Sequence, residues 1–129
     1  HKPDVLITTA PFRTLGQNYG SSHPDHIAAG EAALSSVYPT ARDRLTFPEL
    51  LDEGFEPHKV REVWVMSRED ADHFNDISEE DMETALKALA AHTSQVPPDA
   101  IERVRAWKSE NGKAYNMKYA ESFRTFTLR

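Results

Sequence analysis

Two imidazoles and a carboxylate fall within four residues, in the run His23-Pro24-Asp25-His26. If a helix begins here, residues three apart project from neighbouring points of one helix face. Such a group can place one imidazole on a metal ion and leave the other for proton transfer or for hydrogen bonding to developing charge. Zinc is the natural candidate, because a catalytic zinc takes His and carboxylate ligands, keeps one position for water and lowers the pKa of that water to about 7. The residue types alone leave an ordinary His-rich helix start equally open, since a His pair without further ligands is a common accident.

The segments on either side predict where this run lies. Residues 5–9, Val-Leu-Ile-Thr-Thr, are continuously apolar or β-branched, which favours a central strand covered on both faces of a parallel sheet. The irregular stretch 10–22 follows as a loop. A helix is expected next, with Pro24 in its first turn and an apolar face made of Ile27, Gly30, Leu34 and Val37. Because ligands of open α/β sheets bind at the carboxyl ends of the strands, residues 23–26 are expected at the binding edge.

The middle of the chain predicts a long excursion over the surface. Residues 38–59 hold at most a short helical turn around 49–51, because they contain Pro39, Pro48, Gly54 and Pro57. Irregular segments of this length are often functional, for instance as a wall over a binding site, and a merely decorative insertion is an equally open interpretation.

The remaining elements complete an α/β order. We expect a strand over 60–66, a short strand over 73–77, a helix capped by Ser78 that ends near His92, a helix from Pro98 to Gly112, and a closing strand in the tail. Strands that alternate with helices in this way are typical of an α/β fold and do not resemble a helix bundle.

The composition narrows the class of protein. The 129 residues, 39% apolar and 28% charged, suit one domain or a large part of one. The absence of cysteine excludes disulfides, thiolate metal sites and cysteine nucleophiles. The net charge of −6 has the wrong sign for a protein that binds nucleic acid. No apolar run approaches the roughly 18 residues that a membrane span needs, so the cytoplasm is the default expectation.

Several stretches resemble the LmbE-like, or PIG-L, family of zinc-dependent N-acetylglucosaminyl deacetylases. They are residues 2–8, 23–26, 47–51, 57–64 and 92–95. The His-Pro-Asp-His run is moderately specific by itself and strongly so in this company. The resemblance implies a Rossmann-like, three-layer α/β fold with a mostly parallel sheet, of which residues 1–129 form a single domain, the C-terminal part of a deacetylase domain.

The resemblance also implies a role for each polar residue of the run. His26 is similar to the family's third zinc ligand. His23 is similar to the imidazole that stabilises the tetrahedral intermediate or protonates the leaving amine, and Asp25 to the group that orients it. Amide hydrolysis needs an activated water, positive charge at the developing oxyanion and a proton for the departing nitrogen, so these roles are chemically consistent.

The family's first signature, Ala-His-Pro-Asp-Asp-x-Glu, is absent from this sequence. In the family it supplies two zinc ligands and the general base. It would precede His1, which is followed almost at once by the first expected strand, as in a trimmed chain. We therefore expect a missing N-terminal segment, or a separate chain, to carry the other zinc ligands, and we expect this polypeptide alone to be inactive.

Four other residues are weaker candidates for substrate binding. Tyr19 could hydrogen-bond an oxyanion, His92 could reach the site from the end of its helix, and Arg13 and Arg42 lie in loops that could hold a polar or anionic group. For each of them, a surface or structural role is the alternative.

The leading hypothesis is a zinc-dependent hydrolase that removes an acetyl or other acyl group from the amide nitrogen of an N-acylglucosamine-type sugar or conjugate. One alternative is a non-catalytic domain, derived from such an enzyme, that binds sugar conjugates or serves in assembly. Another is a metal-dependent phosphoesterase, which also uses His and Asp. Each of these is compatible with a homo-oligomer.

Overall fold

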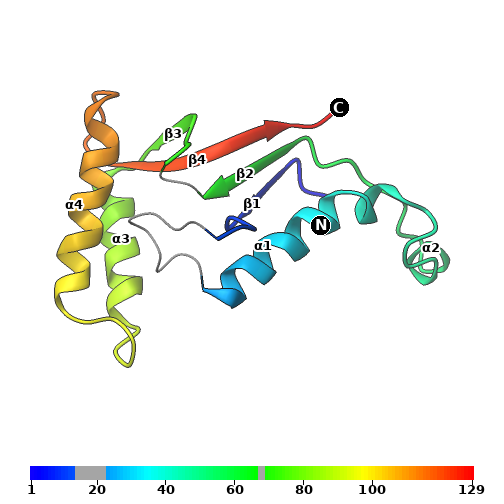
Figure 1. Ribbon diagram of the computed structural model, residues 1–129, viewed down its shortest axis with the longest axis horizontal. Helices are drawn as coiled ribbons and strands as arrows, with labels where there is room; N and C mark the ends of the chain where they lie inside the picture. Colours follow the sequence, from blue (N-terminus) through cyan, green and yellow to red (C-terminus); the bar gives the residue numbers. More distant parts are fainter. Residues whose placement is uncertain (14–22, 67–68) are drawn as a thin grey trace. The chain divides into compact units, whose positions relative to one another are not determined.

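The computed structural model describes residues 1–13, 23–66 and 69–129 (Figure 1). Its elements, in chain order, are β1 (Val5–Thr8), α1 (Pro24–Val37), η2 (Thr40–Arg42), α2 (Glu49–Asp52), β2 (Glu62–Met66), β3 (His73–Asp76), α3 (Glu79–Ala90), α4 (Asp99–Lys113) and β4 (Ala120–Thr127). The chain divides into two compact units, the first made of His1–Asp70 with Arg124–Arg129 and the second of Ala71–Phe123.

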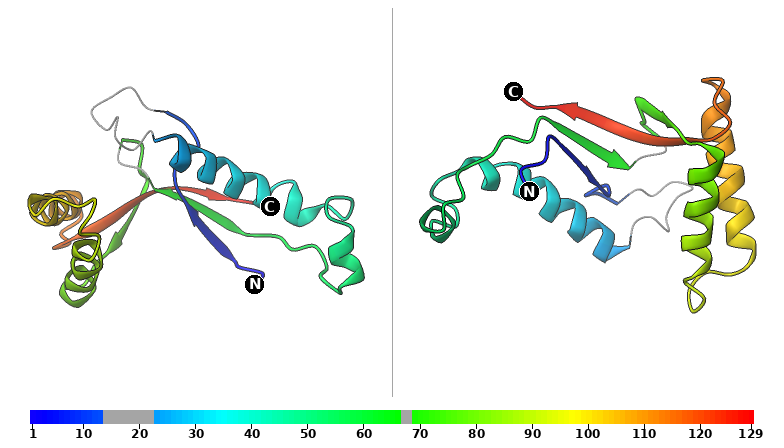
Figure 2. Two further views of the ribbon diagram at one scale, coloured as in Figure 1. Left: turned by 90° about the horizontal axis from the view of Figure 1, so that it is seen from below. Right: turned by 180° about the vertical axis from the view of Figure 1, so that it is seen from behind.

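The first unit contains a parallel strand pair covered by one helix. β1 and β2 pair in parallel, with Ile7 opposite Trp64. α1 lies along one face of this pair (Figures 1 and 2). The core between helix and strands is formed by Val37, Val60, Val63 and Val65, against which Leu6, Ala10, Leu34 and Leu128 pack.

A glycine brings α1 directly against the end of β1. A Cβ at Gly30 would lie 2.6 Å from the carbonyl oxygen of Thr9, so a side chain at this position would clash with backbone. The Thr9 hydroxyl also donates a 2.6 Å hydrogen bond to the carbonyl of His26. The first turns of α1 are therefore held at the carboxyl end of β1, as the sequence predicts for residues 23–26.

The prediction that β1 is a central strand covered on both faces is wrong for this chain. The strand order is β1-β2-β4-β3, which leaves β1 at an edge. Val5 is 38% exposed and Ile7 55% exposed, whereas Thr8 is buried. Side chains alternate along a strand, and within the first unit α1 covers only the face that carries Leu6 and Thr8.

The second unit contains two neighbouring helices and an antiparallel strand pair. β3 pairs with the first half of β4, with His73 opposite Phe123. α3 and α4 lie side by side (Figures 1 and 2), and Met82, Leu86 and Tyr119 form the core. Ser78 caps α3 as predicted, since its hydroxyl accepts a 3.0 Å hydrogen bond from the N–H of Asp81.

Gly112, expected to stop the last helix, lies inside it, because α4 continues to Lys113. Its importance is close approach, since a Cβ there would lie 2.4 Å from the carbonyl oxygen of Met117.

The fold class is α/β and consistent with a Rossmann-like fold, as predicted. The sheet is less parallel than expected, because β1–β2 is parallel whereas β3–β4 is antiparallel. The connections explain this difference. One crossover helix returns the chain to its starting end and gives a parallel strand, whereas two successive antiparallel helices reverse the next strand. Among the described residues, no helix has the length and apolar character that crossing a membrane requires.

Candidate functional site

His23 is the N-cap of α1, and this position defines the state of its ring. Its Nδ1 accepts a hydrogen bond of 3.2 Å from the backbone N–H of Asp25. An accepting nitrogen carries no proton, so the neutral ring has its proton on Nε2. Nε2 of His23 is therefore a hydrogen-bond donor, which suits developing negative charge better than it suits a cation.

Asp25 acts on His23 mainly through its backbone. The nearer carboxylate oxygen lies 3.9 Å from Nδ1 of His23, at the outer limit of an ion pair, and the Asp25 side chain is 89% exposed. Protonation of Nδ1 would make it a donor, which would break the bond to the Asp25 N–H and favour the carboxylate instead. Both partners of the His23 ring thus come from one residue.

His26 lies one turn further along α1 and is exposed. The centroid of its ring is 5.9 Å from that of His23, with an angle of 78° between the rings. Its imidazole makes no hydrogen bond to another described residue, so both ring nitrogens face possible ligands. His23, Asp25 and His26 are thus brought together at the carboxyl end of β1.

The donor chemistry of this group fits zinc, which accepts neutral imidazole as a ligand. The number of donors is smaller than a complete site needs. In the part of the chain that the structure describes, no three His, Asp or Glu side chains are grouped so that they could hold a metal ion. The described residues therefore offer part of a zinc site.

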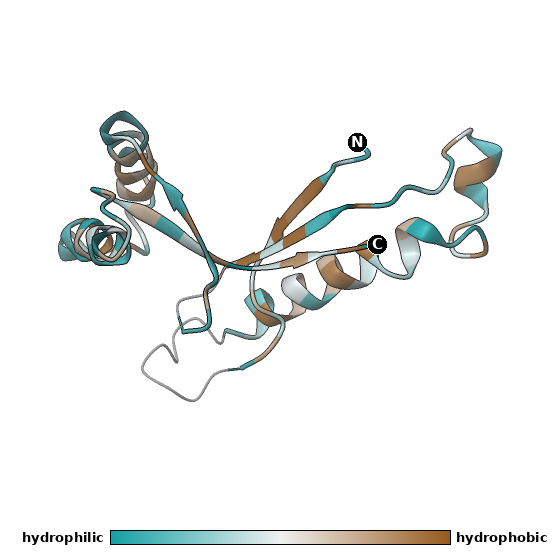
Figure 3. Cartoon of the chain, turned by 90° about the horizontal axis from the view of Figure 1, so that it is seen from above, coloured by the Kyte–Doolittle hydropathy of each residue, from teal (hydrophilic) through white to brown (hydrophobic). Residues whose placement is uncertain are grey.

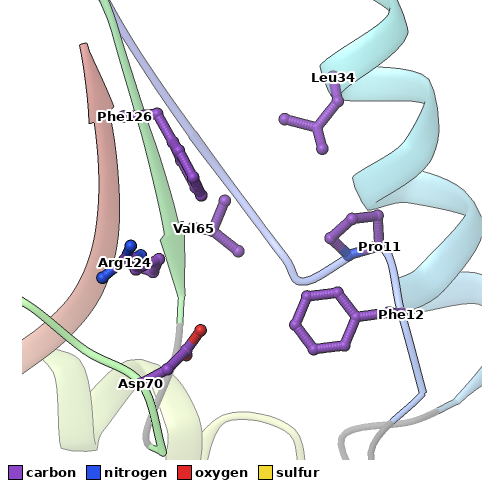
Figure 4. Close-up of a pocket in the computed structure, with 7 residues that line it drawn as sticks. All are labelled: Pro11, Phe12, Leu34, Val65, Asp70, Arg124 and Phe126. Atoms are coloured by element: carbon purple, nitrogen blue, oxygen red, sulfur yellow. The ribbon is translucent and has the colours of Figure 1, made fainter.

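An apolar pocket of about 100 Å³ lies in the first unit (Figure 4). Leu34, Pro11 and Phe12 face Val65 and Phe126 across it, with Asp70 and Arg124 at one end. Pro11 and Phe12 follow β1 directly, and Leu34 is eight residues after His26 on the same stripe of α1, about 12 Å along the helix axis. The pocket can accommodate a small apolar group. Sequence reasoning missed it, because its lining comes from several separate segments.

The weaker candidates lie in different places. The guanidinium of Arg42 donates to the carbonyls of Arg129, at 2.8 Å, and Val60, at 3.5 Å, close to the amino end of β2 rather than to His26. Arg13 is exposed and follows the pocket residue Phe12. His92 is exposed and belongs to the second unit, after α3. Tyr19 lies outside the described residues.

Comparison with known proteins gives solved structures of the same fold. No protein-family model and no curated protein matches the sequence. An N,N'-diacetylchitobiose deacetylase from Pyrococcus horikoshii, solved with its inhibitor MPG, matches 98% of this chain with a TM-score of 0.78 and 26% identity. The resemblance to the LmbE-like, or PIG-L, deacetylases is confirmed.

A second LmbE-like structure, the conserved protein TT1542 from Thermus thermophilus, matches 98% of this chain with a TM-score of 0.72 and 21% identity. This chain covers 46% of the chitobiose deacetylase and 53% of TT1542. It therefore spans about half the length of the LmbE-like proteins that it matches.

Proposed function

We propose that this chain is the C-terminal part of a zinc-dependent deacetylase domain that removes an acetyl or other acyl group from an N-acylglucosamine-type sugar or conjugate. The observation that carries the proposal is the pair His23 and His26 at the start of α1, beside the end of β1. This pair occurs in a chain whose fold matches a deacetylase along 98% of its length.

Each residue of the site has a distinct task in this proposal. His26 holds the zinc ion through its imidazole. When bound, zinc supplies a Lewis acid and an activated water. His23 donates from Nε2 to the amide oxygen of the substrate as that oxygen gains negative charge, and the same proton is available to the departing nitrogen. The backbone N–H of Asp25 keeps this proton on Nε2.

The remaining ligands and the general base come, in this proposal, from a segment outside residues 1–129. This chain alone is then inactive, and the intact protein works in the cytoplasm as a single domain. Arg13, Tyr19 and His92 stay predictions as substrate-binding residues. Arg42 is the least suited of the four, because its guanidinium already donates to two carbonyls.

The test uses the intact polypeptide that carries this chain together with the other ligands. Zinc content and release of free amine from an N-acetylglucosamine conjugate are measured for the wild type and for His26→Ala, which is expected to lose both. His58→Ala is the matched control, because the His58 ring contacts the carbonyl of Pro3 before β1. It should keep both.

Three results would count against the proposal. Sugar binding that survives a chelator and His26→Ala, without amine release, would identify a non-catalytic binding domain. Release of phosphate from a phosphoester would identify a phosphoesterase. Full zinc content in His26→Ala would remove His26 from the metal site.

A further inference from the structure

The excursion between α1 and β2 presents large apolar side chains to solvent. Five of them lie between residues 38 and 55 and are 43–86% exposed: Tyr38, Leu45, Phe47, Leu50 and Phe55. We call this set the apolar arm; Figure 3 shows the hydrophobic colour on α2 and beside it. Together these side chains expose about 500 Å². That area lies at the upper end for a single patch on a monomer, and it is more than half of the roughly 800 Å² that each partner contributes to a standard interface.

The apolar arm is a folded structure rather than a loose loop. The N–H of Leu50 donates to the carbonyl of Phe47 at 3.0 Å, and the N–H of Phe55 donates to the carbonyl of Leu50 at 2.8 Å. At its base, the N–H of His58 donates to the carbonyl of Ala41 at 2.7 Å. A surface held in this way needs little further ordering when it binds, which favours association.

Phe47 gives independent evidence that the arm contacts something outside its own chain. Its φ is 56°, in the left-handed region that bulky side chains rarely adopt. Burial does not explain this conformation, because the residue is 54% exposed. A strained backbone that presents an aromatic ring to solvent is typical of a binding surface.

Most of the charged groups within the arm have partners in the same chain. Arg44 pairs with Glu56, and the Asp43 carboxylate accepts from the N–H of Leu45 and the hydroxyl of Thr46. The exposed carboxylates of α2 and its C-cap, Glu49, Asp52 and Glu53, remain as an acidic rim. The centre of the arm therefore selects a partner that is apolar and needs no matching charge.

We infer that the apolar arm is a self-association surface, which packs against the same surface of a second copy across a two-fold axis. An apolar surface is complementary to itself, and a two-fold contact repeats the same patch on both partners. Two arms of this area supply the apolar centre of a small dimer interface. The acidic rims of the two copies repel each other, so added salt should strengthen the association.

Sedimentation velocity of the full chain over a wide range of concentration tests this inference. The wild type is expected to show a monomer–dimer equilibrium. Leu45→Asp should weaken it by about tenfold or more, because it buries a carboxylate in the apolar centre. Ile7→Asp is the matched control, since Ile7 is a large exposed apolar residue of β1 outside the arm, and it should leave the equilibrium unchanged.

A second variant separates association from folding. Phe47→Asn places a residue that tolerates positive φ at position 47, so the melting temperature of the monomer should not fall while the dimer weakens. Wild-type chain that is monomeric at every concentration would overturn the inference. So would Leu45→Asp and Phe47→Asn chains that associate as strongly as the wild type, or a dimer that Ile7→Asp disrupts equally. Neither zinc nor substrate enters these measurements, so their result is independent of the proposed function.

Discussion

The two compact units use their polar side chains in opposite ways. In the second unit, Arg105 pairs with Glu79 and Glu83, and the buried Lys108 pairs with Glu121. In the first unit, the imidazole of His26 and the carboxylate of Asp25 face solvent at the end of a strand. Charged groups that satisfy one another stabilise a fold, whereas donors left exposed beside a strand end are available to a ligand. The contrast places the chemistry in the first unit.

The largest effect that tests this contrast is expected for His23→Ala in the intact, zinc-loaded protein. Turnover should fall about 10²–10³-fold, because a donor to the developing oxyanion is lost. Zinc affinity should not change, since His23 presents an N–H rather than a lone pair at Nε2. Loss of the N-cap should also cost about 1 kcal/mol of stability. A variant with normal turnover would remove His23 from the chemistry.

The two close-approach glycines make the same comparison with one type of change. Gly30→Ala and Gly112→Ala each place a Cβ against a backbone oxygen, and each should lower the free energy of unfolding by about 1–3 kcal/mol in chemical denaturation. Only Gly30→Ala should also weaken zinc binding, because it shifts α1 away from the end of β1. Equal effects on zinc would contradict the assignment of the site to the first unit.

Lys108→Ala tests whether the second unit relies on its ion pairs. The variant leaves the Glu121 carboxylate, whose side chain is 30% exposed, without its partner. We expect a loss of about 2 kcal/mol, less than for a fully buried pair. Lys113→Ala is the control, because its pair with Glu110 lies in solvent and should contribute under about 1 kcal/mol. Equal losses would mean that burial does not distinguish the two pairs.

The smallest effect is the response of the second unit to acid. A hydrogen bond from Lys118, helped by its charge, lowers the pKa of Glu79 below its ordinary value of 4.5. A lowered pKa stabilises the fold above pH 4.5, and this stabilisation is lost as the pH falls through the folded-state value. Thermal melts below pH 4.5 should therefore show a smaller loss for Glu79→Gln than for the wild type. Glu80→Gln, on the same helix, should melt like the wild type.

Local signals in the sequence were sufficient for the helix starts. Ser78 before three acidic residues predicted the cap of α3, and Pro24 predicted the start of α1. That His23 itself is the N-cap could not be read from residue types, because Ser, Thr, Asp and Asn are the usual caps. Its hydrogen bond appears only once the helix is built.

Burial and long-range packing could not be predicted in the same way. The apolar run of β1 predicted two covered faces, but exposure of a strand depends on which elements lie over it. Gly112 read as a helix stop because its contact with Met117 arises from the return of the chain. The pocket beside Phe12 and Phe126 joins residues more than 100 positions apart, which no local pattern connects.

The bond between His23 and the first turn of α1 links secondary structure to the polarity of a side chain. While the turn is intact, the imidazole is locked as a single tautomer, with hydrogen at its outer nitrogen. If the turn frays, Nδ1 is released, and the ring can present a basic outer nitrogen instead. The winding of one backbone turn thus decides whether the ring offers an acid or a base to whatever approaches it.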